Sequence, residues 1–247
     1  LVEQYFDVTE LAVISGGPKT GEIFSTMPFD HLLFTGSTSI APHVIRGSAE
    51  NIMPLTLELG GKSPVIISQS ANMKQTVDRI MFAKTLNSGQ ICLAPDYIMV
   101  PEDQKEAFSD LAMESIRTMF PTLKDNQDYT SIINERHYDR LKSYLTDAKK
   151  KGAEIVEINP ADENFAQQEH FKIPPTLVMN PSDNMKLMQE EIFGPILPIK
   201  TYQTINEAID YVNAHDRPLG LYYFGADKKE ENEVISRTIS GGVTIND

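Results

Sequence analysis

Residues 58–64 read Glu58-Leu59-Gly60-Gly61-Lys62-Ser63-Pro64 and separate two short apolar runs. These runs, Leu55–Leu59 and Val65–Ser68, have the composition of β-strands. Two adjacent glycines after a strand usually form a turn, because glycine adopts the backbone angles that tight turns need. The segment therefore predicts a break between two strands, and we place a domain boundary near Pro54–Gly61.

On both sides of this break, short apolar runs alternate with longer stretches that carry apolar residues at helical spacing. The short runs predict strands at Leu11–Ser15, His31–Thr35, Leu55–Leu59, Val65–Ser68, Tyr97–Pro101, Thr176–Met179, Ile196–Lys200, Leu221–Phe224 and Val243–Ile245. The longer stretches predict helices at Lys19–Met27, Ser37–Ala49, Met73–Asn87, Glu102–Met119, Arg136–Lys151, Ile205–Ala214 and Asp227–Thr238. Because a parallel connection needs a long crossover, this alternation predicts an α/β fold with an open, doubly wound parallel sheet. The polar segment Asn159–Phe171 predicts an exposed loop.

Composition excludes several classes of protein. The 247 residues are 40% hydrophobic and 23% charged, as in globular proteins, and no apolar run approaches the length of a membrane-spanning helix. With 22 basic and 35 acidic side chains the net charge is −13, and no basic stripe is present, so we expect no nucleic-acid partner. Residues 1–7 lack the pattern of a secretory signal.

Cysteine and histidine usage bears on compartment and metal binding. A single cysteine cannot form an intramolecular disulfide, so we expect a reduced, cytoplasmic setting. None of the histidines lies at metal-ligand spacing from another or beside the cysteine, and we expect no metal site. These histidines are His31, His43, His137, His170 and His215.

The only cysteine, Cys92, follows Glu58 by 34 positions and lies in Gly89-Gln90-Ile91-Cys92, just after a predicted helix. A thiol needs a base or a positive environment to act as a nucleophile at neutral pH, and Glu58 is the candidate base. Taken alone, a single cysteine is most often a small buried apolar residue, and a glutamate at a strand end is most often solvated.

The order and spacing of these two motifs resemble the aldehyde dehydrogenase family. The resemblance implies that Cys92 attacks an aldehyde carbonyl and that Glu58 is the general base, which also activates the water that hydrolyses the acyl-enzyme. The implied activity is oxidation of an aldehyde to the acid through a cysteine thiohemiacetal, with NAD or NADP as cofactor and NAD favoured. The Cys92 N–H is one implied oxyanion donor. The other is an Asn in an Asn-Pro-Trp segment, and this chain has no tryptophan.

Two further motifs extend the resemblance. Phe34-Thr35-Gly36-Ser37-Thr38 closes a predicted strand and opens a helix; alone it predicts a helix cap, whereas the resemblance places Thr35, Gly36 and Ser37 against the cofactor pyrophosphate. Ala41 stands where the family pattern usually has glycine. In Glu190-Glu191-Ile192-Phe193-Gly194-Pro195, an ordinary turn by itself, the resemblance implies that Glu191 holds the nicotinamide ribose and Phe193 supports the ring. The resemblance also implies that Leu59 is a cofactor-binding residue.

Three segments are similar to the class 3 and coniferyl aldehyde dehydrogenase branch: residues 93–97, 217–223 and 240–247. That branch acts on aromatic and fatty aldehydes and typically forms homodimers. Its substrates suit an apolar pocket with aromatic walls, to which Tyr222, Tyr223 or Phe224 could contribute, although ordinary strand positions are the alternative reading of these residues.

The resemblance also implies a domain plan. Only two strand-helix units precede the glycine segment, too few to cover both faces of a sheet, so residues 1–57 are expected to be the C-terminal part of an NAD(P)-binding domain. Residues 58–241 are expected to form the catalytic domain and 242–247 to begin the return to the cofactor domain.

The sequence leaves two other functions open, a cofactor-independent thiol hydrolase and a non-catalytic protein that retains the fold.

Overall fold

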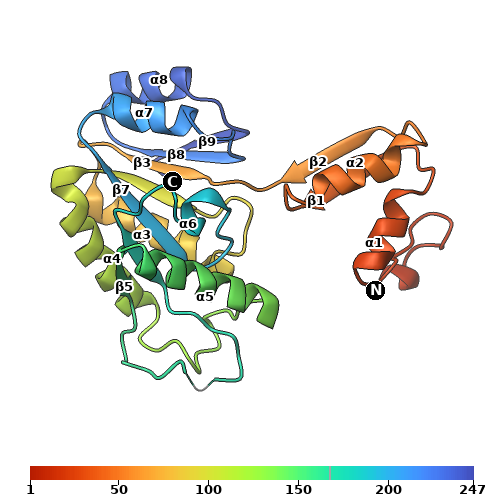
Figure 1. Cartoon of the computed structure of the whole chain (residues 1–247), viewed down its shortest axis with the longest axis horizontal. Helices are drawn as coiled ribbons and strands as arrows, with labels where there is room; N and C mark the ends of the chain where they lie inside the picture. The colour runs from red at the N-terminus through yellow and green to blue at the C-terminus, as the bar shows by residue number, and fades with distance from the viewer. Residues whose placement is uncertain (167) are drawn as a thin grey trace. The chain divides into compact units, whose positions relative to one another are not determined.

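The computed structural model describes residues 1–166 and 168–247, and it divides the chain into two compact units, Leu1–Leu59 and Gly60–Asp247. The division falls inside the glycine-bearing segment that separates the two predicted strands. Each unit has its own sheet and its own apolar core (Figure 1).

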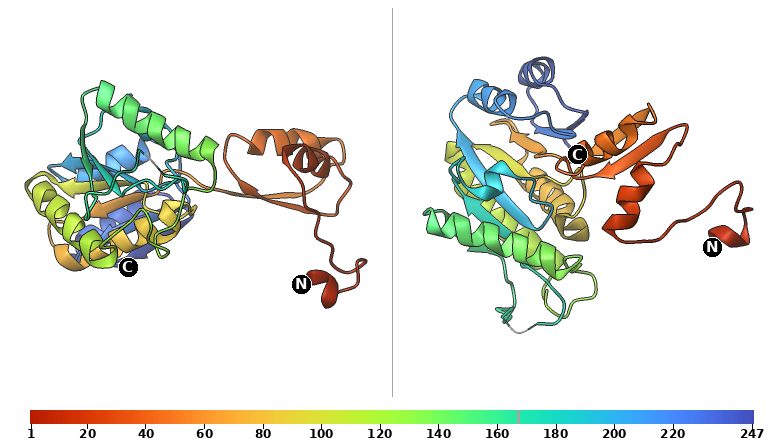
Figure 2. Two further views of the ribbon diagram at one scale, coloured as in Figure 1. Left: turned by 90° about the horizontal axis from the view of Figure 1, so that it is seen from below. Right: turned by 45° about the vertical axis from the view of Figure 1, so that its right-hand side comes forward.

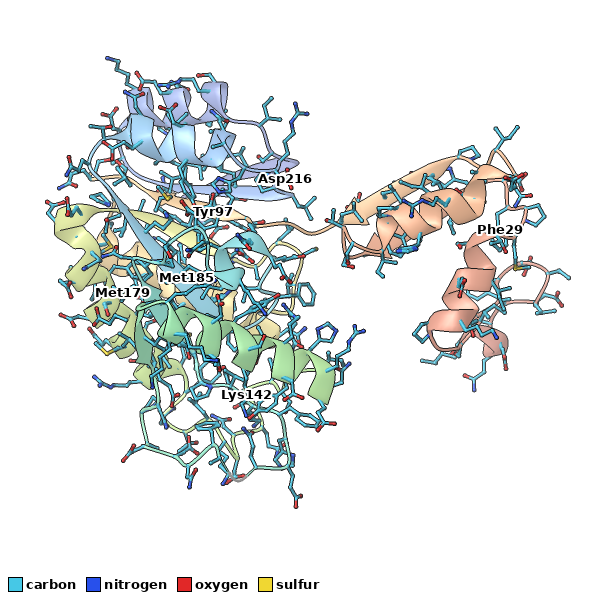
Figure 3. The ribbon with its side chains drawn as sticks, viewed as in Figure 1. Phe29, Tyr97, Lys142, Met179, Met185 and Asp216 are labelled. Carbon is cyan, nitrogen blue, oxygen red and sulfur yellow. The ribbon has the colours of Figure 1, made fainter. Side chains whose placement is uncertain are left out.

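The smaller unit is built on two parallel strands, β1 (Leu32–Gly36) and β2 (Leu55–Leu59). Its helices are η1 (Val2–Gln4), α1 (Pro18–Ser25) and α2 (Ala41–Ala49). The core consists of Leu32, Val44 and Met53, with Phe29 and Phe34 packed against it. Phe29, which Figure 3 labels, also lies against Phe24 with ring centroids 4.7 Å apart.

The larger unit holds a seven-stranded sheet in the order β5-β6-β7-β4-β3-β8-β9. The strands are β3 (Pro64–Ile67), β4 (Tyr97–Pro101), β5 (Glu154–Glu157), β6 (Thr176–Met179), β7 (Ile196–Tyr202), β8 (Gly220–Phe224) and β9 (Gly242–Ile245). The helices are α3 (Met73–Thr85), η2 (Leu86–Gly89), η3 (Glu102–Gln104), α4 (Lys105–Met119), α5 (Glu135–Lys150), α6 (Lys186–Gln189), α7 (Ile205–Asn213) and α8 (Lys228–Arg237). All strand pairs are parallel except β5 with β6.

Side chains that alternate along the strands supply an apolar layer on each face of this sheet. On β3, Val65 and Ile67 join the core formed with α3 and α4, whereas Ile66 joins the core formed with α5, α6, α7 and α8. Figures 1 and 2 show the helices placed on the two sides of the sheet. Because both faces are covered, the central strands are buried along their whole length, as expected of a mostly parallel sheet.

The predicted α/β class is confirmed, with differences at individual elements. The strand expected at Leu11–Ser15 is wrong, because this run has no partner strand among the described residues and exposes its apolar side chains. The antiparallel edge strand β5 and the single-turn α6 were not expected from the pattern. The Asn159–Phe171 segment contains no helix or strand where it is described, and Gln167 lies outside the described residues.

No helix in the described part of the chain is long and apolar enough to cross a membrane.

Candidate active site

Four of the residues expected at the site lie at the carboxyl ends of the paired strands of the smaller unit. In the register of β1 and β2, Thr35 is opposite Glu58 and Gly36 is opposite Leu59. Thr35 and Glu58 are exposed, so both side chains lie on the open face of this two-stranded sheet. The carboxyl ends of parallel strands are where α/β proteins commonly bind ligands.

Ser37 follows directly, but it does not begin the helix. The helix expected from Ser37 begins at Ala41, with Ile40 at the N-cap position and no side-chain cap, so the reading of the Gly-Ser-Thr segment as a cap is wrong. Instead, the Ser37 carbonyl accepts the N–H groups of Ile40 at 3.0 Å and Ala41 at 3.2 Å, and its hydroxyl pairs with Ser39. Residues 37–40 therefore form a turn whose hydroxyl groups are exposed.

The cysteine lies in the larger unit, in a turn after an unusual helix end. Three consecutive residues adopt left-handed backbone angles: Asn87 with φ 51°, Ser88 with φ 53° and Gly89 with φ 70°. Such angles are costly for residues other than glycine, and they cluster at functional sites. Cys92 itself is half-buried, and its main-chain N–H makes no hydrogen bond within the described residues.

Side-chain hydrogen bonds hold this nucleophile loop, residues 86–96, in place. The Ser88 hydroxyl donates to the Thr130 carbonyl. The Gln90 amide donates to the Ser131 carbonyl at 3.0 Å and accepts the Ile133 N–H at 2.9 Å. The strained turn is thus fixed by bonds to a segment about 40 residues further along the chain.

Glu191 and Phe193 lie on a loop between α6 and β7, residues 190–194, which we call the cofactor loop. The Glu191 carboxylate lies so close to Gly60 that a side chain at Gly60 would collide with it. Burial raises the pKa of Glu191, while a hydrogen bond from the Gly61 main chain opposes the shift. Phe193 has a left-handed φ of 48° and is 38% exposed.

The nucleophile loop and the cofactor loop touch each other. A Cβ atom built on Gly89 would lie 2.5 Å from the Gly194 carbonyl oxygen and 3.0 Å from the Lys84 carbonyl oxygen. Only glycine fits at this contact, both because of its φ and because of the close backbone approach. The structure therefore brings the two motifs of the larger unit together, although Glu190, where the second motif begins, follows Cys92 by 98 positions.

Of the three aromatic residues considered for a substrate pocket, only Tyr222 lies beside Cys92. Its hydroxyl donates to the Leu93 carbonyl, one residue after Cys92. The pKa of Tyr222 is raised, first by burial and also by the nearby Cys92 thiol. Tyr223 and Phe224 are 0% and 3% exposed and belong to the apolar cores, so they are ordinary core residues of the strand.

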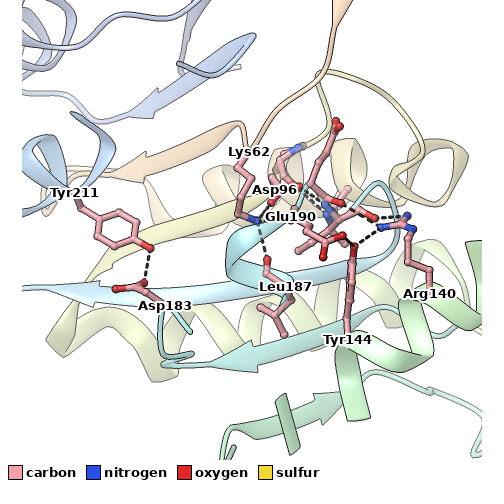
Figure 4. A network of polar contacts seen from close by, with 12 residues as sticks. Lys62, Asp96, Arg140, Tyr144, Asp183, Leu187, Glu190 and Tyr211 are labelled. Carbon is pink, nitrogen blue, oxygen red and sulfur yellow. Dashed lines mark hydrogen bonds and ion pairs between the residues drawn. The ribbon is translucent and has the colours of Figure 1, made fainter. Parts of the chain in front are cut away.

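Several charged groups beneath these loops were not expected from the sequence. Lys84, on α3, is 1% exposed and donates to the Pro95 carbonyl at 2.7 Å, and burial lowers its pKa to about 8. Lys62 and Asp96 form an ion pair nearby, shown in Figure 4, and both contact the cofactor loop. Arg140, on α5, contacts the same loop.

The residues expected at the site are thus distributed over both units. Thr35, Gly36, Ser37, Glu58 and Leu59 belong to the smaller unit. Cys92, Glu191 and Phe193 belong to the larger one. The cooperation of Glu58 with Cys92 stays a prediction. Among the described residues no group of three His, Cys, Asp or Glu side chains has the geometry of a metal site.

The chain is similar in sequence to a known protein family and to several named proteins. A family model described as "Aldehyde dehydrogenase family" matches residues 6–247. A Caulobacter vibrioides protein named "Probable coniferyl aldehyde dehydrogenase" is 59% identical over 98% of this chain and 50% of its own length. A Pseudomonas sp. protein named "Coniferyl aldehyde dehydrogenase" is 53% identical over 100% of this chain and 51% of its own length.

Solved structures agree with the sequence matches. The substrate-bound state of Staphylococcus aureus AldH superposes with a TM-score of 0.91 at 38% identity, over 99% of this chain and 52% of that one. A betaine aldehyde dehydrogenase from the same organism, in complex with NAD⁺, superposes with a TM-score of 0.84 at 28% identity, over 95% of this chain and 47% of that one. The chain spans about half the length of the curated relatives it matches.

Proposed function

Because the chain belongs to the aldehyde dehydrogenase family, whose members use NAD or NADP, we propose that the protein carrying it oxidises an aldehyde to the carboxylic acid with NAD(P) as acceptor. The observation that carries this proposal is the contact between the nucleophile loop and the cofactor loop at Gly89 and Gly194. That contact sets Cys92 and Glu191 on two adjoining loops of one unit, as a reaction between a cysteine adduct and a nicotinamide requires.

The chemistry proposed for Cys92 is covalent catalysis. The Cys92 thiolate attacks the aldehyde carbon and forms a tetrahedral thiohemiacetal. The Cys92 N–H, which has no hydrogen-bond acceptor within the described residues, is suited to bind the oxyanion. A bound NAD(P) would supply the acceptor for the hydride of this carbon, which converts the thiohemiacetal to a thioester. Glu58 then removes a proton from the water that hydrolyses the resulting thioester and releases the acid.

The residues present fit such a cofactor. Glu191 offers carboxylate oxygens that can accept two ribose hydroxyls, and Gly60 leaves room beside that carboxylate which any side chain would fill. Thr35 and Ser37 are exposed at the strand end and the turn, and their hydroxyl groups, with Gly36 between them, are suited to hydrogen-bond the pyrophosphate. Leu59 continues the strand from Glu58 into the glycine turn. We favour NAD over NADP.

For the substrate we propose an aromatic aldehyde such as coniferyl aldehyde, with fatty aldehydes as the second choice. Two relatives at 59% and 53% identity carry that substrate in their names. Leu93, which is 45% exposed, and the half-buried Tyr222 ring lie beside Cys92 and provide an apolar surface. We further propose that the protein that carries this chain is cytoplasmic and forms a homodimer.

The domain assignment is likewise a proposal. Residues 1–57 would belong to the cofactor domain and 58–241 to the catalytic domain. The division between Leu59 and Gly60 supports this plan. Residues 242–247, proposed to lead back to the cofactor domain, include β9, which pairs with β8 at the edge of the larger sheet.

The experiment is turnover of coniferyl aldehyde by the protein that carries this chain, with NAD⁺ and NADP⁺ tested separately, beside the Cys92→Ala variant. We expect reduced nicotinamide to accumulate in step with acid, and the variant to be inactive. Hydrolysis of a thioester or ester substrate without any nicotinamide would favour the thiol hydrolase instead. Absence of both activities, with Cys92 unreactive toward aldehydes, would favour a non-catalytic role.

A further inference from the structure

We propose that Asp96, together with Lys62, is a positioning residue that fixes the cofactor loop against the nucleophile loop, and that Arg140 holds the same loop from the opposite side. This inference rests on the proposed function, since it assigns these residues to the placement of Glu191 and Phe193 for NAD(P). It concerns side chains that touch the loop main chain rather than the reacting atoms. Figure 4 shows the contacts involved.

Asp96 connects three segments although it lies only four positions after Cys92. Its Oδ2 accepts the Ile192 N–H at 2.8 Å, and its own N–H donates to the Ser63 carbonyl at 2.9 Å. Its other carboxylate oxygen pairs with Lys62. Asp96 is 3% exposed, so these bonds are made away from solvent, where a hydrogen bond to a charged group is strongest.

Lys62 holds the residues that precede the loop. Its ammonium group donates to the Leu187 carbonyl at 2.7 Å and to the Glu190 carbonyl at 3.1 Å, as well as to Asp96. The three donors of a lysine are therefore all used, and the partly buried positive charge is balanced by one carboxylate. Lys62 and Asp96 act as one unit, because loss of Lys62 leaves the buried Asp96 carboxylate without its partner, and loss of Asp96 leaves the partly buried Lys62 ammonium group without its carboxylate.

Arg140 and Tyr144 hold the outer side of the loop from helix α5. The Arg140 guanidinium donates to the Glu191 carbonyl at 3.2 Å and to the Ile192 carbonyl at 2.8 Å. The Tyr144 hydroxyl accepts from Arg140 at 3.0 Å and donates to the Glu190 carboxylate at 2.7 Å. Main-chain groups of three consecutive loop residues are thus bonded to charged side chains from elsewhere in the fold.

These contacts determine how the loop meets a cofactor. With its main chain fixed on both sides, the loop presents Glu191 and Phe193 without having to be ordered during binding. Asp96 also ties that position to the nucleophile loop, because it belongs to the segment that carries Cys92. Removal of the pair should release the loop and weaken NAD(P) binding, by about 10-fold for the loss of one to two charged hydrogen bonds.

The test compares Lys62→Met with a matched control, Lys172→Met. Lys172 is buried, at 7% exposure, whereas the Lys62 side chain is 16% exposed, and the Lys172 ammonium group also donates to two main-chain carbonyls, those of Leu123 at 3.2 Å and Asn126 at 2.6 Å. Neither carbonyl belongs to the cofactor loop. Both variants remove an ammonium group that donates to main-chain carbonyls, but only Lys62→Met also leaves a buried carboxylate, Asp96, without its partner. The double variant described below separates that loss of stability from the effect on the loop.

Three quantities are measured in the protein that carries this chain: the melting temperature, the dissociation constants for NAD⁺ and NADP⁺, and amide hydrogen exchange over residues 190–194. We expect Lys62→Met to raise the dissociation constant about 10-fold and to speed exchange in this segment. Lys172→Met should change neither. The double variant Lys62→Met with Asp96→Asn removes the unpaired charge, so it should recover melting temperature while cofactor affinity stays low.

Several outcomes would overturn the inference. It fails if Lys62→Met binds the cofactor as wild type does, or if exchange over 190–194 is unchanged. It also fails if the double variant recovers affinity along with stability, because the pair would then act only through folding. If the wild-type protein binds neither nicotinamide, the proposed function fails first and the positioning role for the cofactor falls with it. The exchange measurement still decides whether the pair holds the loop.

Discussion

Replacing Gly89 by alanine places a methyl group where the nucleophile loop meets the cofactor loop. The new Cβ would lie 2.5 Å from the Gly194 carbonyl oxygen and 3.0 Å from the Lys84 carbonyl oxygen, and both are main-chain atoms that cannot turn away. The left-handed φ of 70° adds about 1 kcal/mol for a residue with a Cβ. Overpacking of this kind costs about 1–3 kcal/mol. We expect a total loss of about 2–4 kcal/mol in the free energy of unfolding.

Gly152→Ala is the matched control, because Gly152 has a φ of 86° but no atom within 4 Å of the position of a Cβ. It should lose only the backbone contribution of about 1 kcal/mol. Urea unfolding of both variants, with the slope m compared to wild type, gives the two losses on one scale. Equal losses in the two variants, within about 0.5 kcal/mol, would refute the close approach of the two loops at Gly89.

Two further predictions concern buried charges. Burial raises the pKa of Glu191, so the folded protein loses stability as pH rises from about 4.5 through the raised value. Glu191→Gln, which cannot ionise, should therefore have a higher melting temperature than wild type at neutral pH. The same variant should bind NAD(P) more weakly. Burial lowers the pKa of Lys84 from 10.5 to about 8, so wild type should gain unfolding free energy, at most about 3 kcal/mol, as pH rises between these values. Lys84→Met should lack that gain. Melting curves across pH measure both effects, and parallel curves for variant and wild type would contradict them.

The sequence predicts strands well where an apolar run is bounded by turn residues. Tyr97–Pro101 and Thr176–Met179 match the structure to the residue. Leu11–Ser15 has the same local character but pairs with no strand in the described chain, and pairing is not a local property. Conversely, β5 begins and ends with glutamate and gives little local signal, yet it pairs along the sheet edge.

For the site, motif order predicts the residues that we propose contact substrate and cofactor, while the charged groups that support the two loops are brought there by tertiary contacts. Lys62 and Asp96 stand in quoted motifs, but their pairing across 34 positions, and the bond from Ile192 to Asp96, follow from no spacing rule. The burial of Lys84, in contrast, could have been predicted from its position in the sequence. Lys84 continues the buried face of α3 after Val77, Ile80 and Met81, and a lysine on an apolar helix face indicates a buried partner.

The central claim is that Cys92 carries the acyl group of an aldehyde after oxidation by NAD(P). The most direct measurement is intact-protein and peptide mass spectrometry of the Glu58→Gln variant, in which deacylation should be slowed by about 10²–10⁴, after mixing with coniferyl aldehyde and NAD⁺. We predict one acyl adduct, on the peptide that contains Cys92, formed only when NAD⁺ or NADP⁺ is present and absent from Cys92→Ala. An adduct of the same mass formed without nicotinamide, or aldehyde oxidation that proceeds in Cys92→Ala, would contradict the account.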